Sequence, residues 1–254
     1  MNNKIYLGLT LLLLLLGGCR KPLETTAKEI TQKELSGCQE VSCPEITIEY
    51  LKVNGKTEAS EKINTEIEDF VIQSLYVGED ESGSTAPTIE KAMEDFIALY
   101  RTHSAEFPGL SAEYFAEITV LESFNNKELL SVSCRNYLYT GGAHGYGMVV
   151  FENFDPKSGA LLGYEDVFQD VSTFSEIAET RFRKDHDIPQ QNSINATGFW
   201  FEDDTFYLPE TFGISKEFVT LQYNQYEIAP YAAGPIVLEI PISKIEDLLK
   251  VSLK

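Results

Sequence analysis

The sequence predicts an α+β protein in which an antiparallel sheet carries helices packed on one side. Two segments, 57–76 and 88–100, place apolar residues at helical spacing. Three later segments, 112–123, 128–139 and 146–154, alternate apolar and polar residues as strands do. With the strand-like residues that precede both helices, this order predicts an N-terminal strand plus two-helix subdomain followed by the main sheet.

The chain of 254 residues is strongly acidic, with a formal net charge of −20. A protein that binds nucleic acid through its phosphates needs a basic surface, so we expect no nucleic-acid partner. The hydrophobic content of 43% is ample for a buried core. The acidity either attracts basic partners over a long range or reflects a solvated surface with no partner.

Residues 1–19 have the pattern of an export signal. Lys4 precedes an apolar run, 9–16, that is too short for an ordinary membrane-spanning helix. Residues 16–19, Leu-Gly-Gly-Cys, resemble a bacterial lipobox, so we expect Cys19 to be acylated and to tether the protein to a membrane. A plain cleaved signal is the alternative. Arg20 replaces the aspartate that retains enteric lipoproteins in the inner membrane, which favours an outer-membrane lipoprotein facing the periplasm, if the host has two membranes.

The rest of the chain divides by composition into three parts. Residues 20–43 are polar and lack periodic apolar positions, which predicts a flexible stalk. Residues 44–125 form the predicted N-terminal strand and helix subdomain, and residues 126–254 form the predicted C-terminal domain.

Three cysteines remain once Cys19 is assigned to lipid. In an oxidising compartment Cys38 and Cys43 would close a small loop ahead of the first strand, and this disulfide is the pairing we expect. Cys134 is then a buried thiol in the middle of a strand. The alternative pairs Cys43 with Cys134 and joins the first strand to the sheet. No histidine lies near the cysteines in sequence to complete a zinc tetrad, so we expect no metal site.

The N-terminal elements follow from local signals. Residues 45–53 alternate and predict a strand, which Asn54-Gly55 ends. Glu58 and Glu61 lie near the positive end of the first predicted helix. The second helix begins near Thr88.

The C-terminal elements are shorter. Residues 125–127 join the first two strands of the main sheet in a hairpin, and residues 155–159 form a turn. Thr173 and Glu176 suggest a capping box for a helix that ends at Lys184. The remaining predicted elements are strands at 205–208, 217–223 and 235–242, and a last short helix capped by Ser243 and Glu246.

Residues 140–147, Thr-Gly-Gly-Ala-His-Gly-Tyr-Gly, connect two predicted strands. Four glycines in eight residues surround His144. Glycine adopts positive φ without a Cβ clash and permits close approach of another chain, so this segment predicts a backbone shape that larger side chains would block.

Three segments together resemble a known family: Tyr139 to Gly145, residues 206–209 (Phe-Tyr-Leu-Pro), and Tyr226 to Gly234. They are similar to the C-terminal domain shared by the anti-sigma factor RsiV and the non-catalytic region of the deacetylase PdaC, a family of envelope proteins with paired domains of unknown function. Residues 45–125 resemble the smaller domain that accompanies it. In RsiV this domain lies outside the cell and binds lysozyme. The resemblance therefore implies a binding or sensing module in the cell envelope, and neither signalling by cleavage nor deacetylation is expected here.

The candidate binding residues lie in two of these segments. They are Tyr139, Gly141, Gly142, His144 and Gly145 in the first, and Tyr226, Pro230, Tyr231 and Gly234 in the second. Aromatic side chains with a polar tip suit sugar faces and protein hot spots. The alternative is that both segments serve packing, with His144 hydrogen-bonded to the backbone.

Catalysis by His144 would require a nucleophile and an orienting acid nearby. The sequence has no Gly-x-Ser-x-Gly and no His-Glu-x-x-His, and His103 and His186 stand alone. We therefore expect no enzyme and no cofactor. The expected ligand is a cell-wall polymer such as peptidoglycan, or a basic protein such as lysozyme. The alternative is an envelope glycan hydrolase that uses His144.

Overall fold

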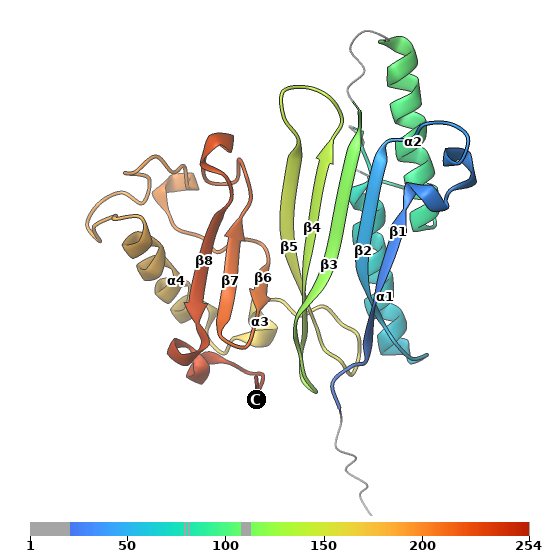
Figure 1. Ribbon diagram of the computed structural model, residues 1–254. Helices are drawn as coiled ribbons and strands as arrows, with labels where there is room; N and C mark the ends of the chain where they lie inside the picture. The colour runs from blue at the N-terminus through green and yellow to red at the C-terminus, as the bar shows by residue number, and fades with distance from the viewer. Residues whose placement is uncertain (1–20, 79, 81, 108–112, 254) are drawn as a thin grey trace, which may run out of the picture.

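The computed structural model describes residues 21–78, 80, 82–107 and 113–253. Within these residues the chain forms two β-sheets and four α-helices (Figure 1), which confirms the predicted α+β class. The lipobox and Cys19 lie outside the described residues. In the described part of the chain, no helix combines the length and the apolar character needed to cross a bilayer.

The first sheet has five strands in the order β1-β2-β3-β4-β5. Their bounds are β1 Thr25–Thr31, β2 Glu45–Val53, β3 Phe115–Asn125, β4 Leu130–Tyr139 and β5 Tyr146–Phe154. Neighbouring strands are antiparallel except β2 and β3, which are parallel. The two helices between β2 and β3 return the chain to the end of the sheet at which β2 began. β3 therefore runs in the same direction as β2.

Helices α1 (Glu58–Ser74) and α2 (Ile89–Glu106) cover one face of this sheet (Figure 1). The hydroxyl of Thr57 caps α1 by accepting from the backbone N–H of Ser60, and Thr88 caps α2 in the same way. The apolar stripes of both helices pack on the inward face of the strands. Fully buried members of this core are Ile46, Ile48, Ile63, Ile67, Val71, Met93 and Ile118.

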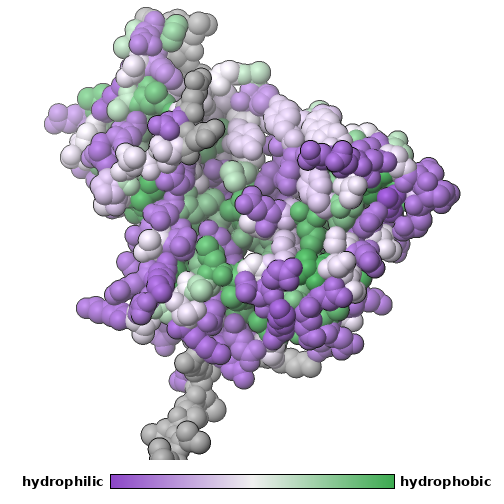
Figure 2. All heavy atoms as spheres, turned by 180° about the vertical axis from the view of Figure 1, so that it is seen from behind, coloured by the Kyte–Doolittle hydropathy of each residue, from purple (hydrophilic) through white to green (hydrophobic). Residues whose placement is uncertain are grey.

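The second sheet has three antiparallel strands, β6 (Phe212–Ile214), β7 (Phe218–Tyr223) and β8 (Ile236–Pro241). Helix α4 (Val171–Asp185) packs on this sheet, and the short α3 (Tyr164–Val167) precedes it. The second core is rich in aromatic rings. Its buried members include Phe168, Phe174, Phe182, Phe201, Phe212, Leu221, Tyr223 and Leu238. Seen from behind, hydrophilic residues cover most of the surface (Figure 2), as expected when both cores are interior.

The outer edge of β5 is where the two sheets meet. The side-chain amide of Asn224 accepts from the N–H of Val149 at 2.8 Å and donates to its carbonyl oxygen at 2.9 Å. The hydroxyl of Thr211 accepts from the N–H of Phe151 at 3.1 Å. Side chains from the second unit thus satisfy backbone groups that an open edge strand would expose.

The prediction of a flexible stalk over residues 20–43 is wrong for much of its length. Thr25–Thr31 forms β1, which pairs with β2 along its whole length. This strand is at the sheet edge and is mostly exposed, so backbone hydrogen bonds hold it and the sequence shows no apolar alternation. Cys38 and Cys43 form a disulfide ahead of β2, and Cys134 is a buried free thiol.

Further differences concern domain and element boundaries. The predicted boundary at 125/126 falls inside the β3–β4 hairpin, so the first structural unit extends through β5 to Phe154. Residues 205–208 are not a strand, because Phe206 packs into the second core instead of joining a ladder. Asp170, not Thr173, caps α4. The last predicted helix is two 3-10 turns, Ile242–Lys244 and Glu246–Leu248.

Candidate binding site at the glycine loop

The two predicted binding segments lie against each other. Residues 140–145, the glycine loop, connect β4 to β5, and the 3-10 turn Tyr231–Ala233 precedes β8 at the same end of the molecule (Figure 1). The ring of Tyr231 stacks on the imidazole of His144, with centroids 3.9 Å apart and planes inclined by 21°. The Tyr231 hydroxyl also donates to the carbonyl oxygen of Gly145 at 2.9 Å. A contact between residues 86 positions apart therefore builds one surface.

His144 is exposed and is held by its neighbours. Its Nδ1 lies 3.0 Å from the carbonyl oxygen of Gly145. A carbonyl can only accept, so Nδ1 carries the hydrogen, which leaves Nε2 unprotonated in the neutral ring. Among the described residues, the imidazole makes no hydrogen bond to a hydroxyl, thiol or carboxylate. The arrangement is a supported aromatic ring and not a paired base and nucleophile.

The glycines of the loop are needed for two different reasons. Gly145 is buried, and a Cβ there would lie 2.5 Å from the Tyr137 hydroxyl and 2.8 Å from the carbonyl oxygen of Leu138. Gly141 and Gly142 have φ of +93° and +94°, and a Cβ on either would meet open space. Crowding by neighbouring atoms therefore requires glycine at position 145, and the positive φ requires it at positions 141 and 142.

Tyr226 extends this surface in an unusual conformation. Its ring centroid lies 5.5 Å from that of Tyr231, and the residue is 53% exposed. Its φ is +69°, a region that is rare for a bulky side chain. Gly234, with φ of +70°, ends the same segment, and the exposed Pro230 begins its turn. We call His144, Tyr226 and Tyr231 the aromatic shelf.

Tyr139 contributes to the loop and not to the shelf. It closes β4, and its hydroxyl donates to the carbonyl oxygen of Gly142 at 3.0 Å. Its role in the structure is to hold the tip of the glycine loop. The structure thus places all nine predicted binding residues at one end of the molecule. Some of them shape or hold the glycine loop, and others form the aromatic shelf.

A pocket of about 150 Å³ lies beside the aromatic shelf. One wall comes from β4 and β5, and the other from the last residues of β7 and the chain that follows it. Its polar lining side chains are Arg135, Asn136, Tyr137, Gln222, Asn224 and Gln225. No sequence pattern had predicted this pocket. The available signal was the alternation in β4, which places Arg135 on the same face as Tyr137 and Tyr139.

Acidic groups lie next to the shelf. The Glu227 carboxylate accepts from the backbone N–H of Asn224 at 2.7 Å. Burial raises the pKa of Glu227, and the nearby Glu210 raises it further, while the Asn224 hydrogen bond acts in the opposite direction. Trp200, 44% exposed, donates its indole N–H to the Glu227 carbonyl oxygen at 3.1 Å. This side of the molecule therefore combines exposed rings with negative charge.

The histidines lie apart from one another. His103, on α2, contacts the Tyr114 hydroxyl at 2.5 Å, and His186 packs 4.5 Å from the ring of Phe182. Within the described ranges, no group of three or more His, Cys, Asp or Glu side chains is placed to hold a metal ion.

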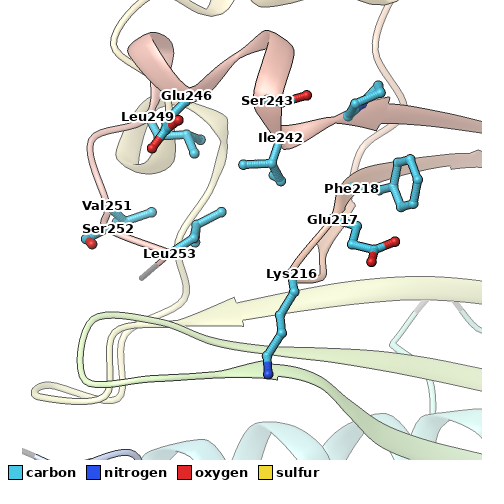
Figure 3. Close-up of a pocket in the computed structure, with 11 residues that line it drawn as sticks. Lys216, Glu217, Phe218, Ile242, Ser243, Glu246, Leu249, Val251, Ser252 and Leu253 are labelled. Carbon is cyan, nitrogen blue, oxygen red and sulfur yellow. The ribbon is translucent and has the colours of Figure 1, made fainter.

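A larger pocket, of about 740 Å³, lies at the opposite end of β7. Figure 3 shows that its lining comes from the β6–β7 turn with Lys216 and Glu217, from Ile242 and Ser243, and from the C-terminal segment. None of the predicted binding residues lines it. It shares no residue with the pocket beside the shelf.

Comparisons with known proteins match two successive parts of the chain. Residues 38–146 match the family described as "Deacetylase PdaC", and residues 165–243 match the "Protein of unknown function (DUF3298)" family. The peptidoglycan-N-acetylmuramic acid deacetylase PdaC of Bacillus subtilis (strain 168) is 26% identical over 128 residues, which cover 49% of this chain and 27% of that enzyme. The chain thus spans about a quarter of the length of this relative.

Two crystal structures share the fold. A DUF3298-family protein from Bacteroides fragilis superposes with a TM-score of 0.68 at 23% identity, covering 90% of this chain and 94% of that one. A DUF3298-family protein from Pseudomonas aeruginosa gives 0.61 at 20% identity, covering 90% and 95%. The glycine loop falls in the PdaC-like part and Tyr226 to Gly234 in the DUF3298 part, so the aromatic shelf lies where the two meet. The chain thus matches a PdaC-like domain followed by a DUF3298 domain, the pairing that the sequence resemblance predicted.

Proposed function

We propose that this protein is a non-catalytic, lipid-anchored binding module of the cell envelope, and that it holds a cell-wall glycan on the aromatic shelf. One observation carries the proposal. Tyr226 is 53% exposed and has φ of +69°, where asparagine or glycine would be easier to accommodate. Strain of this kind collects at functional sites, and an exposed ring gives little to folding, so the side chain is best explained by a contact with a ligand.

The chemistry of the shelf suits a sugar. Tyrosine and histidine rings offer a flat apolar face with a polar tip, which matches the alternating apolar and hydroxyl surfaces of a pyranose. The name of the Bacillus subtilis relative says that it acts on peptidoglycan, which supports a cell-wall polymer as ligand. Because the chain spans only about a quarter of that enzyme, we do not assign deacetylation to it.

A basic protein such as lysozyme is the second candidate. The formal charge of −20 favours a cationic partner, as does Glu227, which has Glu210 nearby and accepts from the exposed Trp200 through its carbonyl oxygen. Binding of this kind would weaken steeply as salt is raised from low to physiological concentration, whereas stacking on a sugar would not.

Retention on insoluble, purified peptidoglycan tests the proposal. The chain from residue 21 onward, which contains every described element, is compared with Tyr226→Asn. Asparagine tolerates positive φ, so the free energy of unfolding should stay within about 1 kcal/mol of wild type. Loss of the ring should reduce retention by at least about fivefold, the effect of a hot-spot side chain. Leu161→Asn, a 50% exposed residue at the far end of the first sheet, is the matched control.

Equal retention of wild type and Tyr226→Asn would refute a role for the shelf. The same preparation tests the hydrolase alternative. If wild type releases soluble sugar from peptidoglycan and His144→Ala does not, while the melting temperature is unchanged, the protein is an enzyme and the proposal is wrong.

A further inference from the structure

We infer that the pocket beside the aromatic shelf recognises a carboxylate on the ligand, and that Arg135 is the residue that binds it. The inference rests on the proposed glycan binding and adds to it the chemical class of the group that is recognised. Within the described residues, the structure gives Arg135 a position in the pocket wall and no protein partner.

The other described arginines are all engaged. Arg101 donates to the carbonyl oxygen of Gly37 at 3.0 Å, and Arg181 and Arg183 form ion pairs with acidic residues of α4. Arg135 makes neither a hydrogen bond nor an ion pair with any described residue, although acidic residues outnumber basic ones two to one, 40 against 20. A guanidinium that stays unpaired in so acidic a protein keeps five donors available for another molecule.

The register of the strands explains why the guanidinium of Arg135 has no partner among the described residues. Arg135 lies opposite Thr119 on β3 and Val149 on β5, so no carboxylate faces it across the sheet. Glu117, the nearest acid on that face by register, lies opposite Tyr137 and forms no ion pair with Arg135. The backbone groups of Val149 are already bonded to Asn224. The groups directly opposite Arg135 are thus neutral, and the backbone groups of Val149 are already satisfied.

The rest of the pocket offers neutral polar groups. Gln225 makes no hydrogen bond to a described residue, and Gln222 uses only its N–H, which donates to Asn224 at 3.2 Å. Amide side chains supply both donors and acceptors, as an acetamido or hydroxyl group would require. A single charged group among amides suits a ligand with one negative charge and several neutral polar groups.

Size and position decide what enters. A volume of about 150 Å³ is below that of sites that enclose a whole small molecule, roughly 300–1,000 Å³. The pocket therefore takes a substituent and not the whole ligand. Gln225 precedes Tyr226 and Pro235 follows Gly234, so two lining residues of the pocket are direct chain neighbours of the segment that carries the shelf tyrosines. A sugar on the shelf would place a carboxylate substituent in the pocket.

Peptidoglycan offers such a carboxylate from two sources, the lactyl ether of muramic acid and the free end of a peptide stem. Three probes separate them: N-acetylmuramic acid, N-acetylglucosamine, and the dipeptide D-Ala-D-Ala. Each is titrated into the isotope-labelled chain from residue 21 onward. Amide shifts of Gly147 and Val149 and the side-chain signals of Gln222, Gln225 and Arg135 report on the pocket.

The expected result is that at least one carboxylate-bearing probe shifts the pocket signals, and that N-acetylglucosamine does not. Whichever carboxylate probe binds identifies the source. Arg135→Gln should weaken that binding by roughly tenfold to a hundredfold, as expected when a charge-assisted hydrogen bond is lost. Its melting temperature should not change, because the side chain has no partner among the residues that the structure describes. Arg181→Gln removes the same charge from α4 and should bind like wild type.

Three outcomes would overturn the inference. They are no pocket shifts with either carboxylate probe, equal affinity for N-acetylmuramic acid and N-acetylglucosamine without dipeptide binding, and an Arg135→Gln variant that binds like wild type. In each case retention on peptidoglycan, and its loss in Tyr226→Asn, would still stand as evidence for the proposed function. Conversely, dipeptide binding in the pocket without retention of wild type on peptidoglycan would refute glycan binding on the aromatic shelf and leave carboxylate recognition by Arg135 standing.

Discussion

Glu152 should make the protein less stable as pH rises from about 4.5 toward neutrality. Its side chain lies on the helix-facing side of β5, and its Oε2 is buried with no hydrogen-bond partner among the described residues. Burial, and then the nearby Glu66 on α1, raise the pKa of Glu152 from 4.5 to about 7. The folded state therefore binds a proton more tightly than the unfolded state does.

The size and sign follow from proton linkage. A rise from 4.5 to about 7 corresponds to about 3 kcal/mol of the free energy of unfolding. Between those two pH values the folded state holds more protons, so stability falls as pH rises. The contribution is fully present below pH 4.5 and is lost by about pH 7. Glu152→Gln keeps the shape and removes the charge, so it should stabilise the protein at pH 8 and have little effect at pH 5.

Urea unfolding of wild type and Glu152→Gln at several pH values between 5 and 8 measures this effect. The difference between the two proteins is the relevant quantity, because the many other acids contribute equally to both. It should grow with pH toward about 3 kcal/mol. A constant difference across the range would show that this carboxylate ionises normally, and the reasoning from its burial would be wrong.

Three further predictions concern stability, two at the candidate site and one at the disulfide ahead of β2. Gly145→Ala should cost about 1–3 kcal/mol in thermal unfolding, because the new Cβ crowds the carbonyl oxygen of Leu138; a cost no larger than that of Gly142→Ala, which meets only backbone strain, would contradict this. Asn224→Ala should cost about 2 kcal/mol in urea unfolding, because it leaves both edge groups of Val149 unpaired, and an unchanged midpoint would show that water replaces the amide. Reduction of the disulfide should cost about 2 kcal/mol, the value for a loop this short, and identical urea curves with and without reductant would argue against that bond.

Sequence patterns predicted those elements whose side chains alternate between core and solvent. The stripe of α1 and the alternation of β4 both follow from one buried face, so periodicity found them. β1 was not predicted because it is an edge strand, held by its backbone pairing with β2 and not by an apolar face. The opposite error occurred at residues 205–208, which were predicted as a strand. Phe206 packs in the aromatic core, but its segment joins no sheet.

The candidate site was predictable in its unusual residues only. The glycines around His144 and the segment near Tyr231 were identifiable because their composition departs from that of ordinary strands and turns. Their contact depends on how the second sheet meets β5, which no local pattern contains. Arg135 is an ordinary strand residue in the sequence, and only the fold shows that none of the described residues pairs with it.

The course of β1 bears on how the protein would sit at a membrane. The backbone N–H of Leu23 bonds to Asn125, at the end of the first sheet that lies farthest from the glycine loop. If Cys19 carries lipid, the six residues to Thr25 reach at most about 20 Å. Such a short tether would hold that end of the sheet near the bilayer. The aromatic shelf would then face away from the membrane, roughly 30 Å further along the strands.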